Sequence, residues 1–248
     1  MEGLAHARRL AGGSGMALSD VEIGRYARQL LLPRMGEAAQ ELLRGARIRI
    51  SGGGLAMAPA VYYLAAAGVG TIWIDDPDEV KPGTGAGFAL GPADLGRQRG
   101  AALVEFARGV NGLVAVDLFR PGSRPTALLV CGASLDISRA IADEARLLQL
   151  PHVVADVDGQ GGAATSVPVG APCYSCAVRP GLGAAATAEG GATVGALSAL
   201  ELVLLITGAS LEPRARRIEV FRGTPLVRAT ARQPGCACAG PAAAGLAP

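Results

Sequence analysis

The order of hydrophobic and polar residues predicts helices and strands in alternation along the chain. Apolar positions with helical spacing predict helices over residues 20–32, 38–44, 58–67, 101–110, 137–148 and 193–206. Short, mostly apolar runs predict strands over residues 47–50, 71–75, 114–118, 127–131, 153–157, 165–169, 218–221 and 226–230. Because the two kinds of element alternate, we expect an α/β fold of the Rossmann-like, three-layer type, with a mostly parallel sheet.

A glycine turn joins the first predicted strand to the helix that follows it. The strand at 47–50 runs into Ser51 and then into Gly52, Gly53 and Gly54. The next strand ends in acidic residues, Asp75 and Asp76. A strand, a glycine turn, a helix and a strand that ends in an acid form a βαβ unit typical of nucleotide-binding folds.

The chain reads as one domain between two tails. Residues 1–15 lack the apolar run of a signal peptide, so we expect a disordered tail over 1–17, one domain over 18–240 and a short tail over 241–248. The Gly/Ala-rich run at 181–192 and the residues after Cys238 are predicted to be mobile. The apolar run at 193–206 carries Glu201 and is too short to span a bilayer, so it predicts a buried helix.

Composition changes this picture little. There are 23 basic and 21 acidic residues, a net charge of +2, which gives no electrostatic reason to expect a nucleic acid or a membrane as partner. Arginine supplies nearly all of the basic residues, because Lys81 is the only lysine. With no export signal, we expect a cytoplasmic protein with reduced cysteines.

Four of the five cysteines form two close pairs. Cys173 and Cys176 are spaced as CxxC, and Cys236 and Cys238 as CxC. Two thiol pairs far apart in sequence suit a tetrahedral zinc site, which would clamp a C-terminal extension to the domain. The alternative is two reduced pairs that hold no metal. Cys131 ends a predicted strand and is expected to be a small core residue.

Six segments in the same order resemble motifs of one family. They are RYARQ at 25–29, AAAGVG at 65–70, DPDEV at 76–80, DLG at 94–96 with VN at 110–111, PCYSC at 172–176 and PGCAC at 234–238. Together they resemble the ThiF/MoeB/HesA family, relatives of the ubiquitin-activating enzymes, over roughly residues 18–240. An NAD-dependent oxidoreductase would rest on the βαβ unit alone and is disfavoured by these motifs.

The resemblance implies ATP-dependent adenylation. In that family, ATP is held at the glycine turn with magnesium, and the C-terminal carboxylate of a ubiquitin-like sulfur-carrier protein attacks its α-phosphorus. It implies that Gly52 and Gly54 cradle the phosphates and that Asp76 binds the ribose. It also implies that Arg99, in place of the family lysine, faces the phosphates and that Arg28 reaches the nucleotide of a partner subunit. The alternative for the glycines is a plain strand–helix turn, the alternative for Asp76 is a solvated acid, and the alternative for Arg28 is an ordinary surface arginine.

Several positions depart from the family pattern. Leu55 and Met57 replace glycines of the turn, and Met57 is expected to push the helix away from the strand. Thr84, Gly87 and Phe88 stand where the family carries Asn, Arg and Gln. Ala133 stands in place of the magnesium aspartate, and Asp136 lies three residues further on. Thr187 lies near the position of the family's loop cysteine. His6 and His152 have no visible catalytic partner.

These departures predict slow turnover of ATP, so whether the chain is an enzyme stays open. It either adenylates, or assists adenylation of, a sulfur carrier, or it is a degenerate pseudoenzyme that binds an active paralogue, a carrier or a peptide. We expect a dimer, either of two copies or with a family paralogue.

Overall fold

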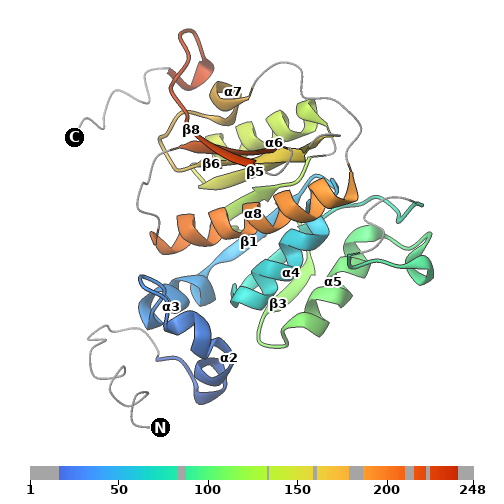
Figure 1. Cartoon of the computed structure of the whole chain (residues 1–248). Helices are drawn as coiled ribbons and strands as arrows, with labels where there is room; N and C mark the ends of the chain where they lie inside the picture. The colour runs from blue at the N-terminus through green and yellow to red at the C-terminus, as the bar shows by residue number, and fades with distance from the viewer. Residues whose placement is uncertain are drawn as a thin grey trace.

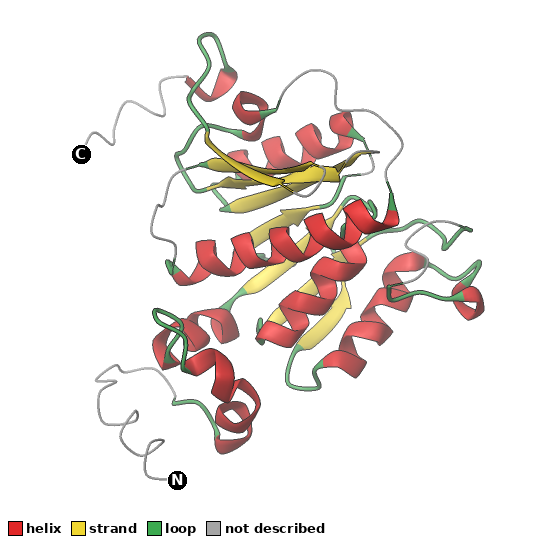
Figure 2. Cartoon of the chain, viewed as in Figure 1, coloured by secondary structure: helices red, strands yellow, loops and turns green. Residues whose placement is uncertain are grey.

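The computed structural model describes residues 17–82, 88–132, 134–158, 161–178, 187–209, 215–221 and 224–239. Helices and strands alternate along this part of the chain (Figures 1 and 2). The helices are α2 (Asp20–Leu30), α3 (Glu37–Gly45), α4 (Met57–Ala67), α5 (Arg99–Val110), α6 (Leu135–Leu147), α7 (Tyr174–Ala177) and α8 (Ala188–Thr207), with short 3₁₀ turns at Pro92–Asp94 and Ala237–Ala239. The strands are β1 (Arg47–Ser51), β2 (Thr71–Asp75), β3 (Ala115–Leu118), β4 (Ala127–Val130), β5 (His152–Asp158), β6 (Gly161–Val167), β7 (Arg216–Phe221) and β8 (Thr224–Ala229).

The strands form one eight-stranded sheet in the order β3-β2-β1-β4-β5-β6-β7-β8. From β3 to β5 each neighbouring pair is parallel, and from β5 to β8 each pair is antiparallel. The antiparallel part includes β5 with β6 and β7 with β8, pairs joined by only two residues each, which is too short for a parallel crossover. The predicted α/β fold with a mostly parallel sheet is confirmed.

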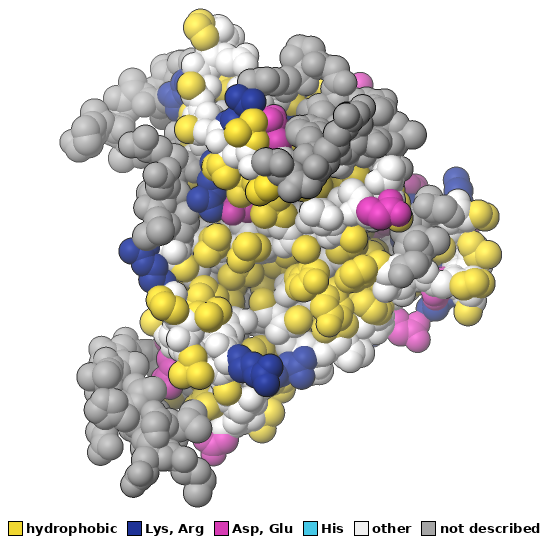
Figure 3. All heavy atoms as spheres, viewed as in Figure 1, with side chains coloured by type: hydrophobic (Ala, Val, Ile, Leu, Met, Phe, Trp, Pro, Cys, Tyr) yellow, Lys and Arg dark blue, Asp and Glu magenta, His cyan; other side chains and the backbone are white. Residues whose placement is uncertain are grey.

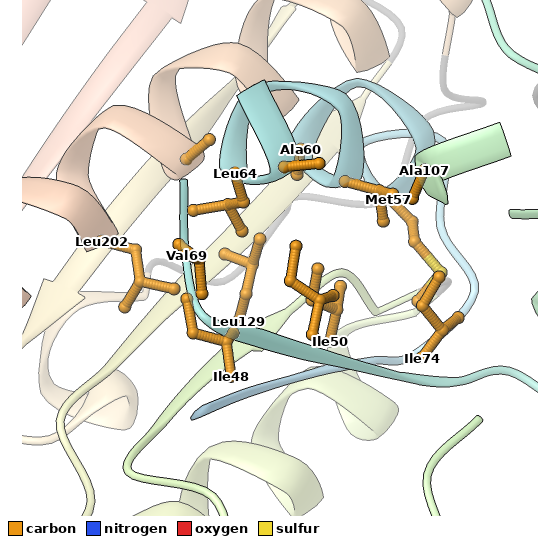
Figure 4. Close-up of a cluster of buried hydrophobic side chains, with 14 of the residues drawn as sticks. Ile48, Ile50, Met57, Ala60, Leu64, Val69, Ile74, Ala107, Leu129 and Leu202 are labelled. Atoms are coloured by element: carbon orange, nitrogen blue, oxygen red, sulfur yellow. The ribbon is translucent and has the colours of Figure 1, made fainter. Parts of the chain in front are cut away.

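Helices cover both faces of the sheet. Helices α4, α5 and α8 lie on one face, and α6 and α7 lie on the other (Figure 1). The main core lies between β1, β2 and β4 and the helices α4 and α8, where Ile48, Ile50, Leu129, Leu64 and Leu202 are almost fully buried (Figure 4). Burial of these apolar side chains is the largest stabilising contribution that the fold offers.

Helix α8 is long and apolar enough to cross a membrane by length and composition, but half of that stretch is buried inside the protein. It packs on α4, β5 and β6. Gly191 and Gly195 allow this close packing, because an added Cβ would lie 2.7 Å from the Leu55 Cβ and 2.4 Å from the Ala56 carbonyl oxygen, respectively. The predicted buried helix is therefore a core helix of the domain.

Two predicted boundaries differ from the structure by more than two residues. The mobile loop expected at 181–192 is wrong from residue 188 onward, because α8 begins there and the Thr187 hydroxyl caps it by accepting from the Gly190 N–H at 3.1 Å. Residues 181–186 lie outside the described part of the chain. The strand expected at 165–169 is Gly161–Val167, since its glycine-rich start pairs with the end of β5. Sequence pattern misses both because glycine carries no apolar side chain to signal burial.

We expect Leu129→Ala to lower the free energy of unfolding by about 2–5 kcal/mol, because it leaves a cavity beneath α4. Thermal unfolding should show a midpoint lower by roughly 5–15 °C. Leu147→Ala, at a leucine that is 71% exposed, is the matched control and should change little. Equal losses in the two variants would contradict the assignment of Leu129 to the core.

Candidate nucleotide site and metal centre

The glycine turn lies at the carboxyl end of β1, where the strand order reverses. The chain passes from β1 to β2 on one side, and β4 lies on the other side of β1. In open α/β sheets, ligands bind in the crevice at such a switch point. The fold therefore puts the turn where a nucleotide site is expected.

Close contact with the end of β4 explains two of the glycines in this turn. A Cβ added at Gly52 or Gly54 would lie 2.8 Å from the Cys131 carbonyl oxygen. The Gly54 N–H donates to that oxygen at 2.6 Å, and Gly53 pairs with Gly132. The backbone of the turn is thus closed against β4, and the Gly54 N–H is already used. Cys131 is fully buried, as predicted, and burial raises the pKa of its thiol far above the usual value.

Asp76 and Arg99 form a buried ion pair beside the turn. The Arg99 Nε donates to Asp76 Oδ2 at 2.5 Å and its Nη2 to Oδ1 at 2.8 Å, a bidentate arrangement. The side chains are only 1% exposed for Asp76 and 9% for Arg99. A Cβ at Gly53 would lie 2.3 Å from the Arg99 Nη2, so the guanidinium rests on the glycine turn.

Backbone pairing brings Arg99 to Asp76. The segment after β2 pairs with the segment before α5 through the Val80 N–H to the Arg97 carbonyl at 2.9 Å and the Arg99 N–H to the Asp78 carbonyl at 2.7 Å. Gly100 lets α5 start directly against the end of β2, because an added Cβ would lie 2.6 Å from the Asp76 carbonyl oxygen. The sequence identifies both charged residues, but their mutual pairing depends on this tertiary contact.

The replaced positions are accommodated rather than disruptive. Met57, expected to push α4 from the strand, is 2% exposed and belongs to the core, and Leu55 packs on Gly191 of α8. Phe88 is 41% exposed, and its ring lies edge-on to the Tyr62 ring with the two ring centroids 5.7 Å apart. Asp136 is exposed in the first turn of α6. The expected departures Thr84, Gly87 and Ala133 lie outside the described residues.

Arg28 lies far from the glycine turn of its own chain. It is exposed on α2, and within the described part of the chain its guanidinium has no ion-pair or hydrogen-bond partner. Helix α2 packs against the C-terminal end of α4, where the Gln29 Nε2 donates to the Ala67 carbonyl at 3.2 Å. The glycine turn precedes the other end of α4, an 11-residue helix and so about 16 Å long.

The four paired cysteines converge on one cluster. Their Sγ atoms all lie within 4.8 Å of one another, with Cys173 to Cys236 and Cys176 to Cys238 each at 3.5 Å. Sulfurs around a tetrahedral zinc ion lie about 3.8 Å apart, so this donor set could hold a metal ion. Burial works to raise the pKa of Cys238, but hydrogen bonds from the Cys173 backbone and the neighbouring thiols lower that pKa to about 7.

His152, the one histidine within the described residues, is buried in the domain and has a structural role. His152 begins β5 and is 1% exposed, with its Nδ1 at 3.0 Å from the Leu150 carbonyl oxygen. Burial lowers the pKa of His152, so the ring is neutral at physiological pH. His152 and Cys238 line a pocket of about 90 Å³, which puts the cysteine cluster near the amino end of β5. The glycine turn lies at the other end of the parallel strands, after the carboxyl end of β1.

These features define an α/β fold with the glycine turn typical of nucleotide-binding proteins and a cysteine cluster that could hold a metal ion. The ThiF family model matches residues 26–238, and the chain belongs to the ThiF family. The chain is similar to "Adenylyltransferase and sulfurtransferase uba4" of Aspergillus niger (30% identical over 89% of this chain and 53% of that protein) and to "Adenylyltransferase and sulfurtransferase MOCS3" of Bos taurus (33% identical over 90% and 54%). It thus spans about half the length of these curated relatives.

Solved structures support the fold. The chain superimposes on the crystal structure of E. coli MccB with AMPCPP and MccA with a TM-score of 0.73, at 17% identity over 87% of this chain and 74% of that one. A crystal structure of PaaA gives a TM-score of 0.67, at 17% identity over 92% and 81%. At this level of identity the likeness concerns the fold alone.

We expect Asp76→Ala to lower the free energy of unfolding by about 3–5 kcal/mol, because it leaves the buried Arg99 charge without its partner. Replacing both residues, Asp76→Leu with Arg99→Met, should recover most of that loss. Chemical denaturation of the three proteins measures the effect. Asp117→Ala is the control, since its pair with Arg120 is more than half exposed and should contribute little. If Asp76→Ala loses no more than this control, the Asp76–Arg99 pair does not stabilise the site.

Proposed function

We propose that this chain takes part in ATP-dependent adenylation of the C-terminus of a ubiquitin-like sulfur-carrier protein. One observation carries the proposal: the glycine turn, Asp76 and Arg99 meet at the switch point of the sheet in a ThiF-family chain. The names of the relatives, which call them adenylyltransferases and sulfurtransferases, support the same chemistry. In this proposal the protein works in the cytoplasm.

Each residue at the turn has a proposed role. The backbone of Gly52 and Gly54 lies against the phosphates, Asp76 accepts hydrogen bonds from the ribose hydroxyls, and Arg99 stabilises negative charge on the phosphates. ATP supplies the adenylyl group when it is bound. For this arrangement, Arg99 must leave Asp76, and the Gly54 N–H must be released from the Cys131 carbonyl. Nucleotide binding therefore has to exchange protein contacts for ligand contacts.

The magnesium aspartate of the family has no counterpart at its expected position in this sequence. Asp136 is exposed on α6, and the position expected to carry the family's aspartate is Ala133. No step of the proposal is therefore assigned to a magnesium ion. Zinc, in contrast, fits the four clustered thiols, and we assign Cys173, Cys176, Cys236 and Cys238 as its ligands.

The position of Arg28 supports a role in the site of another subunit. Arg28 lies near the C-terminal end of α4, whereas the glycine turn of the same chain precedes the N-terminal end of that helix. The Arg28 guanidinium is exposed and has no partner within the described residues. Helices α4 and α8 also present a hydrophobic surface, with Tyr62, Tyr63 and Leu200 between 37% and 52% exposed (Figure 3). A second copy or a family paralogue could cover this surface and receive Arg28 at its nucleotide.

A second candidate function is that of a pseudoenzyme that assists an active paralogue without adenylating by itself. The Asp76–Arg99 pair favours it, because each residue neutralises the charge that the other would offer to a nucleotide. Phe88 favours it too, because it replaces a polar residue of the family with an exposed aromatic ring.

ATP–pyrophosphate exchange with candidate carriers distinguishes the two functions. We expect the isolated chain to exchange far more slowly than relatives with the full residue set, since losing one charge-stabilising group costs about 10²–10³ in rate. Arg99→Ala should abolish the remaining exchange if the chain has its own activity, and Arg120→Ala, at an exposed arginine, is the control. Fast exchange by the purified chain would contradict the predicted slow turnover. Exchange that is unaffected by Arg99→Ala would remove Arg99 from the site.

Mixing two variants tests the role of Arg28. We expect Arg28→Ala and Asp76→Asn to lose activity when each is alone, because one removes the donated arginine and the other the ribose ligand. Part of the activity should return when the two variants are mixed, since mixed dimers contain one pocket with Asp76 that receives Arg28 from the other copy. With a paralogue as partner, Arg28→Ala should lower adenylation by the complex. A mixture as inactive as its components, together with an unaffected complex, would show that Arg28 does not act in trans.

A further inference from the structure

Two separate segments supply the four thiols of the metal centre. Cys173 directly precedes α7, and Cys176 lies within it. Cys236 and Cys238 follow β8. A site made from two segments binds tightly when both are held in place before the ligand arrives, because less ordering free energy is then lost on binding. The contacts that hold these segments together thus bear directly on metal affinity.

One contact ties the C-terminal segment to a ligand cysteine itself. The backbone N–H of Gln233 donates to Cys176 Sγ at 3.4 Å, and its side-chain Nε2 donates to the Cys176 carbonyl oxygen at 3.1 Å. Gln233 thus binds α7 at the residue whose sulfur would bind the metal. Partners of this kind orient the ligands and tune the metal.

A second tie passes through the interior. Tyr174 stands between the two cysteines of α7, is 1% exposed, and donates from its hydroxyl to Asp156 Oδ1 at 2.5 Å. The other oxygen of Asp156 accepts from the Arg217 Nη1 at 2.7 Å. Arg217 contacts Glu219 at 3.3 Å, and Glu219 contacts Arg228 of β8 at 3.2 Å. This series of five polar side chains connects α7 to β8, the strand that precedes Cys236 and Cys238.

The inner members of this series, Asp156, Arg217 and Glu219, are charged and nearly buried, which is costly and argues for a purpose beyond packing. Arg217 is 2% exposed, and one of its nitrogens, Nη2, is buried without a hydrogen-bond partner among the described residues. Apolar residues of similar volume are often at least as stabilising as a buried ion pair, whereas polar contacts impose one specific geometry. Here the polar contacts run from α7, next to one cysteine pair, to β8, which precedes the other pair.

We propose that Tyr174 and Gln233 are positioning residues of the metal centre, which hold both cysteine pairs at ligation distance before the metal binds. The inference rests on the zinc assignment made above and does not depend on adenylation. The sulfurs of the two pairs lie 3.5 Å apart, a spacing at which all four can reach one ion.

Metal titration of the 248-residue chain tests this. Zn²⁺ affinity is measured by competition with a chromophoric chelator, and Co²⁺ is used as a spectroscopic probe of tetrahedral thiolate coordination. We expect Tyr174→Phe and Gln233→Ala each to weaken Zn²⁺ binding by about ten- to a hundredfold, as loss of outer partners of metal ligands does. Tyr62→Phe, which removes the hydroxyl of a partly exposed tyrosine on α4, is the matched control and should bind like the wild type.

Each outcome decides the proposal. Weaker metal binding by the two variants, with circular dichroism and metal-free unfolding midpoints close to those of the wild type, supports positioning. Wild-type affinity and an unchanged Co²⁺ spectrum in both variants would overturn positioning and leave the zinc assignment intact. If the wild-type chain binds neither Zn²⁺ nor Co²⁺, the zinc assignment fails and this inference fails with it, while adenylation would still be judged by pyrophosphate exchange. If variants that lose affinity also unfold at much lower temperature, their role is general stability, and the positioning proposal is rejected.

Discussion

Close backbone contact around the turn after β1 is the constraint on which the rest of the structure depends. The turn is enclosed between the end of β4 and the start of α8. A Cβ at Gly54 would collide with the backbone after β4, and a Cβ at Gly195 of α8 would collide with the backbone of Ala56. Helix α4 begins directly after this turn, and α8 packs on α4 as well as on β5 and β6. The enclosure also gives the glycines of the turn a packing reason that holds whether or not a nucleotide binds.

The same constraint explains how charge is arranged beside the turn. Arg99 rests on Gly53, where an added Cβ would lie 2.3 Å from the guanidinium Nη2, so a larger residue would have to displace the guanidinium from its present position. The guanidinium and the Asp76 carboxylate are both nearly buried, so each satisfies the other in place of water. Nucleotide binding would have to compete with this pair. The pair thus connects the stability of the fold to the proposed chemistry.

The glycine turn and the cysteine cluster lie at opposite ends of the parallel strands and are built on different principles. The glycine turn uses backbone geometry and one ion pair at the carboxyl ends of the parallel strands. The cysteine cluster uses side chains from two distant segments near the amino end of β5, joined through the antiparallel half of the sheet. A metal ion there would fix the C-terminal segment without touching the nucleotide site. This separation lets the two centres be tested independently.

The sequence by itself determined the kind of fold, the place of the glycine turn and the identity of the four clustered cysteines. These follow from local information: hydrophobic periodicity, the position of glycines after a strand, and the spacing of thiols. The tertiary structure alone decided that Arg99 pairs with Asp76, that Met57 fits into the core, that α8 begins at Ala188, and that Gln233 and Tyr174 tie the cysteine segments together. Each of these depends on which distant segments meet, and a linear pattern of residues does not record the contacts that burial and backbone packing select.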